Sequence, residues 1–182
     1  MVIDPIKKFF SANPDCVFLH ASSISISGKA LLFLGHSNAG KSTISGILSR
    51  QFHKIADDKV LIYRKKNWMV RGVKGDRFLR ENSGDDIDST EYPVIAVARI
   101  FQDKETRFIS ISQKEACRHI MDAVFENDFQ NNYEDLSQIK KWFKIAANLS
   151  HNTKGYRLTF PKCESIIEKV SEFIGNEMRQ KT

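Results

Sequence analysis

One stretch of the 182-residue chain decides the fold, ALLFLGHSNAGKST from Ala30 to Thr43. Its first five residues are an uninterrupted apolar run, which is typical of a strand buried on both faces, as in a parallel sheet. Gly35 to Ser42 then matches the pattern GxxxxGK[ST], and residues 40–51 have the apolar spacing of an amphipathic helix. A strand, a glycine-bounded loop and a helix in this order predict a phosphate-binding loop, or P-loop.

Each residue type in this loop has a physical reason. Gly35 and Gly40 let the backbone curl so that successive N–H groups point at one phosphate, and the following helix adds its positive dipole end. Lys41 is expected to reach the β- and γ-phosphates of ATP, and the Ser42 hydroxyl is expected to help hold Mg²⁺. The residues expected to contact the nucleotide are Gly35, His36, Ser37, Asn38, Ala39, Gly40, Lys41, Ser42 and Thr43.

Strand-like and helix-like segments interleave along the rest of the chain. Alternation over residues 16–26 and apolar runs at 55–56, 60–63, 94–101, 107–111 and 156–160 predict strands. Helical spacing follows a capping box at residues 112–115 and recurs at 136–149 and 166–174, and residues 4–10 suit a short amphipathic turn. We therefore expect an α/β fold: a single P-loop domain over residues 1–182, with a mostly buried mixed sheet flanked by helices.

Two adjacent carboxylates follow the loop and its helix. Asp57 and Asp58 come directly after Ile55-Ala56 and shortly before the apolar run that begins at Val60. A carboxylate at the end of a neighbouring strand commonly holds the metal and its water in phosphoryl-transfer sites. Adjacent side chains of an extended strand point to opposite faces, so one aspartate is expected to face the phosphates. A solvated acidic turn is the alternative interpretation.

These motifs together resemble the catalytic domain of bacterial HPr kinase/phosphorylases, and still more the HPr-kinase-like proteins of peptide-modification gene clusters. The resemblance rests on Leu19-His20-Ala-Ser-Ser, on GHSNAGKST and on Ile55-Ala56-Asp57-Asp58. It implies an HPr-kinase-like fold in which Asp58 or Asp57 is the base toward a substrate serine hydroxyl. The other aspartate, expected to be Asp57, would hold Mg²⁺ with Ser42, and His20 would lie near the transferred phosphoryl group.

The chain also departs from that family. The glycine-rich segment that follows the aspartates in the family has only a partial counterpart, Val70-Arg71-Gly72-Val73. The separate amino-terminal domain of the family has no counterpart in the sequence. Both departures disfavour HPr itself as the substrate, and the first disfavours phosphorolysis.

Charge is distributed unevenly along the chain. The net charge is +6, yet residues 59–80 alone hold eight basic residues and one acid, and an acidic block follows at 81–91. A solvated face with a mobile loop is the plain interpretation of this basic segment. The alternative is that Arg71, Lys74, Arg77 or Arg80 closes over nucleotide phosphates or an acidic substrate, with residues 81–91 as a lid. Charge concentrated so locally disfavours a nucleic-acid partner.

Cysteine spacing and hydropathy bound the expected location. The three cysteines have neither a disulfide-framework spacing nor a zinc-site spacing. No apolar run is long enough to span a bilayer. A cytoplasmic protein with no membrane span is therefore expected.

The function that these observations predict is a kinase that uses ATP and Mg²⁺. It would transfer the γ-phosphoryl group to a hydroxyl, with serine of a peptide or protein as the acceptor. A catalytically silent ATP-binding regulatory or accessory module and a small-molecule kinase stay open as alternatives. An ABC-type ATPase is disfavoured because no LSGGQ-like segment occurs. The resemblance also implies a homo-oligomer.

Overall fold

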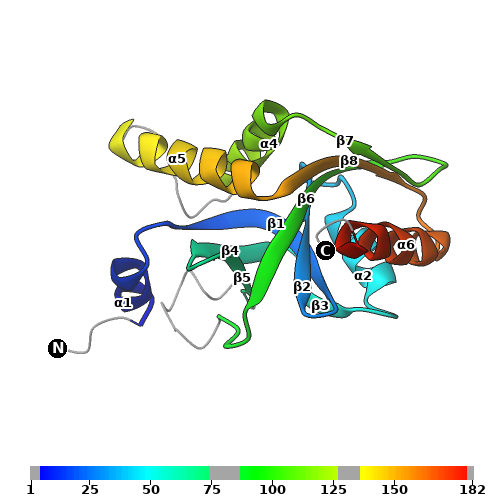
Figure 1. Cartoon of the computed structure of the whole chain (residues 1–182), viewed down its shortest axis with the longest axis horizontal. Coiled ribbons are helices and arrows are strands. Elements are labelled where there is room, and N and C mark those ends of the chain that lie inside the picture. Colours follow the sequence, from blue (N-terminus) through cyan, green and yellow to red (C-terminus); the bar gives the residue numbers. More distant parts are fainter. Residues whose placement is uncertain (1–4, 74–86, 127–135, 180–182) are drawn as a thin grey trace.

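The computed structural model describes residues 5–73, 87–126 and 136–179 and has a mixed α/β fold in which helices flank a mixed sheet (Figure 1). The helices are α1 (Pro5–Ala12), α2 (Lys41–Leu48), α4 (Gln113–Phe125), α5 (Leu136–Asn152) and α6 (Ser165–Arg179). The strands are β1 (Cys16–Ile26), β2 (Lys29–Leu34), β3 (His53–Ala56), β4 (Lys59–Arg64), β5 (Trp68–Gly72), β6 (Tyr92–Gln102), β7 (Arg107–Ser110) and β8 (Lys154–Phe160). The α/β class and the mixed sheet expected from the sequence are confirmed.

The sheet partly closes on itself. Its strand order is β2-β1-β4-β5-β6-β8-β7, and β2 also pairs with β6, so the first five strands form a ring. The two longest strands make this ring possible, because each pairs in more than one place along its length. The first half of β1 pairs with β4, and its second half pairs with β2 and β3. The start of β6 pairs with β5, and the rest runs parallel to β2 and β8.

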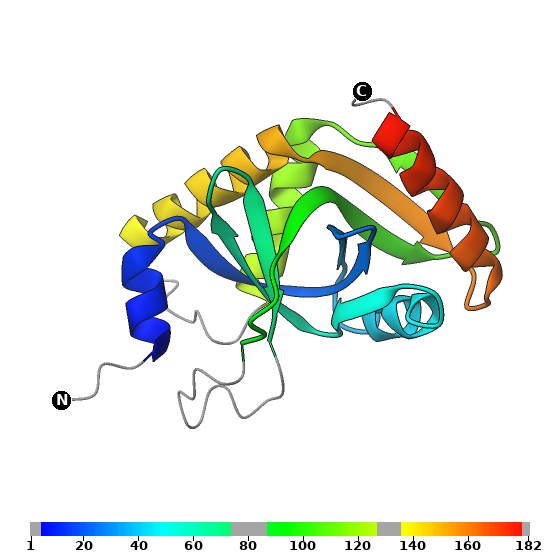
Figure 2. The same cartoon turned by 60° about the horizontal axis from the view of Figure 1, so that its bottom comes forward.

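β2 is buried on both faces, as its apolar run predicts. Ala30, Leu32 and Leu34 belong to a core shared with α4 and α5. Leu31 and Phe33 belong to a second core shared with α2 and α6. The two pairs of helices therefore cover opposite faces of the sheet around β2, β6 and β8 (Figures 1 and 2).

The prediction of a solvated basic face over residues 59–80 is wrong in part, because this segment contains β5. Trp68, Val70 and Gly72 are buried, whereas Met69 and Arg71 between them are partly exposed. This is the period-two pattern of a half-buried strand. Its charges obscured the pattern at the level of sequence.

The chain outside the sheet also differs slightly from prediction. The short turn expected at residues 4–10 is the helix α1, and its Phe9 packs edge-on against Tyr63 of β4, with ring centroids 5.0 Å apart. The helix expected at 40–51 is shorter, ending at Leu48. None of the helices in the described segments is long and apolar enough to cross a bilayer.

Candidate functional site

The glycine loop, residues 35–42, connects β2 to α2 by a tight turn. Gly40 has a φ of 101°, a conformation that side chains disfavour, and it caps the amino end of α2. A β-carbon on Gly40 would lie 2.9 Å from the side-chain nitrogen Nε2 of Gln102. A β-carbon on Gly35 would lie 2.7 Å from that of Ala39. Both glycines are therefore required by the shape of the loop.

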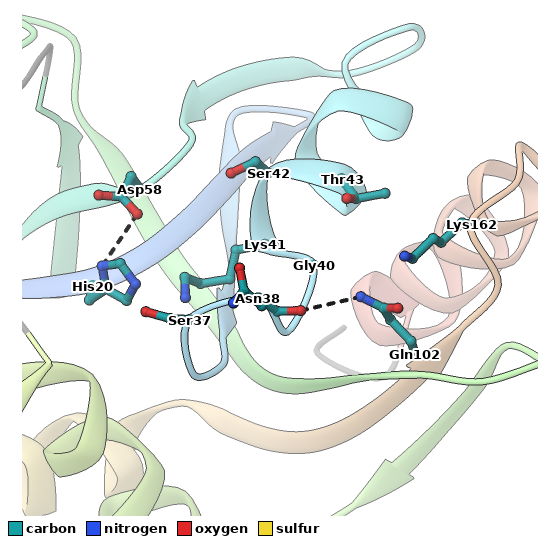
Figure 3. Close-up of a pocket in the computed structure, with 10 residues that line it drawn as sticks. All are labelled: His20, Ser37, Asn38, Gly40, Lys41, Ser42, Thr43, Asp58, Gln102 and Lys162. Carbon is teal, nitrogen blue, oxygen red and sulfur yellow. Dashed lines mark hydrogen bonds and ion pairs between the residues drawn. The ribbon is translucent and has the colours of Figure 1, made fainter.

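A cavity of about 550 Å³ opens at the glycine loop (Figure 3). It lies where the three mutually parallel strands β2, β6 and β8 end, which is where open α/β sheets bind their ligands. β2 continues into the loop, β6 ends at Gln102, and Lys162 follows β8. The cavity is lined by His20, Ser37, Asn38, Gly40, Lys41, Ser42, Thr43, Asp58, Gln102 and Lys162.

Lys41 is folded back onto the glycine loop. Its ammonium group donates hydrogen bonds to the carbonyl oxygens of Gly35, at 2.6 Å, and His36, at 3.1 Å. The side chain is buried, and burial lowers the pKa of Lys41. The Ser22 hydroxyl of β1 donates to the Lys41 carbonyl oxygen at 3.0 Å, which fixes the start of α2. Within the described residues, the hydrogen-bond partners of this ammonium are these two carbonyl oxygens, which an anion in the cavity can replace.

Asp58 and His20 form a pair in the cavity wall. His20 Nδ1 lies 3.3 Å from Asp58 Oδ1 (Figure 3). Burial and the charge of Lys41 lower the pKa of His20, which favours a neutral ring. The Asp58 side chain is 58% exposed, so its carboxylate remains open to the cavity. The Asp58 carbonyl oxygen also accepts from the Ala21 N–H at 2.9 Å, so the backbone beside His20 is fixed as well.

Asp57 points elsewhere. Its two oxygens accept hydrogen bonds from the Ser45 hydroxyl, at 2.7 Å, and from the Lys54 ammonium, at 2.6 Å. Partial burial opposes ionisation of Asp57, but these hydrogen bonds outweigh it and lower its pKa. Asp57 does not line the cavity. The two aspartates occupy a turn between β3 and β4 rather than an extended strand, and the structure brings only Asp58 to the glycine loop.

Close contact between β3 and β5 fixes the position of that turn. A β-carbon on Gly72 would lie 2.2 Å from the Ile55 carbonyl oxygen. Only the absence of a side chain at Gly72 lets β3 lie this near. Ile55 precedes Asp57 by two residues, so this contact sets where the carboxylates stand.

The cavity has a chemistry that suits Mg²⁺ bound with a phosphate ligand. Mg²⁺ takes oxygen ligands, keeps several waters, and is commonly held by one or two protein oxygens together with substrate phosphates. Ser42 Oγ in the first turn of α2 and the Asp58 carboxylate line the same cavity. In the described segments no group of three or more His, Cys, Asp or Glu side chains could hold a metal by itself. A metal here would therefore depend on the ligand for most of its coordination.

Not every residue expected to contact nucleotide lines the cavity. Gly35, His36 and Ala39 are absent from its lining; Gly35 and Ala39 lie close to each other, and the exposed His36 ring is hydrogen-bonded through Nδ1 to Glu126 Oε1, at the end of α4. Arg71 does not line the cavity either: its guanidinium donates to the Tyr63 hydroxyl and the Glu91 carboxylate. Lys74, Arg77 and Arg80, and the predicted lid up to residue 86, lie outside the described residues.

Sequence reasoning missed Gln102, Lys162 and Glu126. Gln102 donates to the carbonyl oxygens of Asn38 and Ala39, at 3.4 and 3.3 Å, and so supports the loop from β6. Gln102 and Lys162 follow apolar strands that are parallel to β2, so a signal did exist: polar residues at the carboxyl ends of parallel strands. No local pattern pointed to Glu126.

Fold and site together define a class: an α/β domain whose GxxxxGKS loop sits at the carboxyl ends of its parallel strands, facing a histidine–aspartate pair. Within that class, the chain belongs to the family described as SynChlorMet cassette protein ScmC, whose family model matches residues 2–171.

Among the solved structures similar to this chain is the Hpr(Ser) kinase/phosphatase from Coxiella burnetii. The two are 12% identical with a TM-score of 0.45, and the match covers 90% of this chain and 97% of that one. A search of curated proteins finds no match.

Proposed function

We propose that this chain is a kinase that transfers the γ-phosphoryl group of Mg-ATP to a hydroxyl group. The observation that carries the proposal is the Asp58–His20 pair, which lines the same cavity as Lys41 and Ser42. This combination joins a phosphate-binding loop to a carboxylate that can accept a proton. Such an arrangement suits phosphoryl transfer to an alcohol, because catalysis there consists of positioning, charge stabilisation and proton removal.

The loop residues would bind the phosphates. Backbone N–H groups of the glycine loop and the amino end of α2 would donate to them. The Lys41 ammonium would exchange its two loop carbonyls for phosphate oxygens, which are stronger acceptors. Ser42 would be the protein ligand of Mg²⁺, and the metal when bound would neutralise charge on the phosphates. Lys162, across the loop from Asp58, would add a further positive charge (Figure 3).

Asp58 would be the base. Its carboxylate is exposed to the cavity and can accept the proton of an acceptor hydroxyl as that oxygen attacks phosphorus. His20, whose pKa is lowered by burial and by the charge of Lys41, would lie beside Asp58 without neutralising the carboxylate. Asp57, held by Lys54 and Ser45, would steady the turn and α2. We therefore assign the base to Asp58 rather than Asp57.

The acceptor is proposed to be serine of a peptide or protein, on the resemblance of His20, the glycine loop and the aspartate turn to HPr kinases. One observation favours a second candidate, an ATP-binding module without transfer activity. Only one of the two adjacent aspartates faces the cavity, because Asp57 is engaged by Lys54 and Ser45.

Binding and transfer are separated by one set of variants. Two quantities are measured for the wild type, Lys41→Ala and Asp58→Asn. The first is binding of a fluorescent ATP analogue, and the second is transfer of a labelled γ-phosphoryl group to a library of serine-containing peptides. We expect Lys41→Ala to weaken binding, and Asp58→Asn to bind normally but lose transfer by about a hundredfold or more. Lys169→Ala, on the exposed face of α6, is the matched control for charge removal.

The outcomes distinguish the two candidates. Binding of ATP by the wild type with no labelled product on any acceptor would support the silent module. Undiminished transfer by Asp58→Asn would refute the assignment of the base, and undiminished nucleotide binding by Lys41→Ala would refute the assignment of the glycine loop.

A further inference from the structure

A second cavity, of about 260 Å³, lies far from the glycine loop. It opens beside Lys29, the first residue of β2, whereas the glycine loop begins after the last residue of that strand. Six residues of strand, rising about 3.3 Å each, separate the two places by about 20 Å. The second cavity is lined by Lys29, Arg64, Lys66, Asn67, Trp68, Pro93, Val94, Ile95 and Asn152.

Among the residues that the structure describes, its lining is positively charged and contains no acid. Lys29, Arg64 and Lys66 all line it, and in the described part of the chain none of them forms an ion pair. The next residue of the same hairpin behaves differently: Lys65 points to the other face, where its ammonium pairs with Glu91 at 2.6 Å. The charge of the hairpin is thus paired with an acid on one face, whereas on the face of this cavity no acid of the described segments pairs with it.

The cavity is also built, rather than a chance gathering of long side chains. The Asn148 side-chain oxygen on α5 accepts hydrogen bonds from three groups around the cavity: Arg64 Nη1 at 2.8 Å, Trp68 Nε1 at 3.1 Å and Asn152 Nδ2 at 3.1 Å. The Trp68 side chain is buried, so one wall is rigid. These contacts hold the guanidinium of Arg64 at the cavity, and they use one of its five N–H donors.

We propose that this second cavity is a binding site for an oxyanion group, either a carboxylate or a phosphate. A guanidinium fixed by one hydrogen bond, two ammonium groups and the side-chain amide of Asn67 present the donors that such groups require. The volume is below the roughly 300–1,000 Å³ of pockets that enclose whole ligands. The site therefore takes a single charged group, either a free anion or an acidic side chain of a peptide. This goes beyond the proposed function and does not depend on it.

The two tryptophans of the chain provide a local readout. In a ¹H–¹⁵N correlation spectrum each indole N–H gives one signal, and Trp68 lines the cavity whereas Trp142 is buried against α4. The full chain is titrated with inorganic phosphate and, separately, with a hexaglutamate peptide, at about 0.1 M NaCl so that long-range charge effects are screened. We expect the Trp68 signal to move to saturation while the Trp142 signal stays still. Phosphate at the glycine loop would not produce this pattern.

Charge variants of the same hairpin complete the test. Arg64→Gln and Lys66→Gln should each weaken binding about tenfold or more, since each removes a charge-assisted hydrogen bond. Lys65→Gln removes the same charge from the other face and should change binding by less than about twofold. Saturation by phosphate alone identifies a free anion as the ligand, and saturation by the peptide with competition by phosphate identifies a peptide group. No shift of Trp68 with either probe, or equal effects of all three variants, would overturn the proposal.

Discussion

Gly72→Ala tests how the aspartate turn is positioned. The new β-carbon would lie 2.2 Å from the Ile55 carbonyl oxygen, and contacts of this kind are essentially never below 3.0 Å, so β3 and β5 must separate by at least 0.8 Å. The Ile55 carbonyl oxygen and the Gly72 backbone are each fixed in the sheet, because β3 pairs with β1 and β5 pairs with β4 and β6. Neither can rotate away as the end of a side chain would. We expect the free energy of unfolding to fall by about 2–3 kcal/mol, the upper part of the range for overpacking.

Gly46→Ala is the matched control. Gly46 lies on α2, and a β-carbon there meets no atom within 4 Å. Alanine should stabilise the helix by about 0.5–1 kcal/mol. Urea unfolding of the two variants and the wild type compares glycine-to-alanine changes that differ only in surroundings. A midpoint for Gly72→Ala equal to or above that of the wild type would refute the argument.

The same substitution should affect the site. A shift of nearly 1 Å in β3 passes to Asp57 and Asp58, which follow Ile55 after one intervening residue, Ala56. Misplacement of a catalytic group by about 1 Å commonly costs about a hundredfold in rate. If the proposed kinase activity is present, Gly72→Ala should lose transfer to this extent at a temperature where it is still folded, while Gly46→Ala retains it.

Three further predictions concern titration and reactivity. Burial lowers the pKa of His20 below its ordinary 6.5, so near that pH the unfolded chain binds a proton that the folded chain does not. The free energy of unfolding should therefore fall as the pH drops below about 6.5, and it should fall less in His20→Gln. Urea midpoints at about pH 7.5 and about pH 5.5 measure this difference. Hydrogen bonds from Lys65 and Tyr63 lower the pKa of Glu91 to about 2. The ionised carboxylate therefore stabilises the fold above about pH 4.5, and this stabilisation is lost as the pH falls toward 2. In the same assay Glu91→Gln should lower the free energy of unfolding by about 1–3 kcal/mol at neutral pH and should not show this loss at low pH. The Cys163 thiol is exposed and its pKa is lowered by the Ser165 hydroxyl, whereas burial raises the pKa of Cys16 to about 11. Iodoacetamide should therefore modify Cys163 at least about tenfold faster than Cys16, as measured by peptide mass spectrometry. Faster modification of Cys16 would contradict the structure.

The part of the site that sequence could predict is the part encoded locally. The strand, the glycine loop and α2 are consecutive, and each has its own pattern within Ala30 to Leu48. Gln102 and Lys162 reach the same cavity because β6 and β8 run parallel to β2. Pairing between strands so distant in sequence leaves no periodic signal, so the residues could be seen as strand ends but not as neighbours.

The sequence also could not show which of Asp57 and Asp58 faces the cavity. An extended strand would have sent adjacent side chains to opposite faces, but the two residues lie in a turn, where Lys54 and Ser45 hold one carboxylate. The sequence likewise could not show where the charges of the basic segment, residues 59–80, point. Net charge describes a stretch as a whole, whereas in β4 and β5 the partners of Arg64 and Arg71 lie on different faces of the hairpin.

The ring of five strands has a consequence for the order in which the chain acquires its structure. The glycine loop is complete early in the sequence, yet β2, which leads into it, pairs along its length with β6, and Gln102 at the end of β6 supports the loop. Pairings between such distant segments form late, because the intervening chain must first be ordered. During synthesis on the ribosome the loop would therefore lack the support of Gln102 until β6 has emerged. A fragment ending at Gly72 would contain the entire motif and still lack the surface that gives it shape.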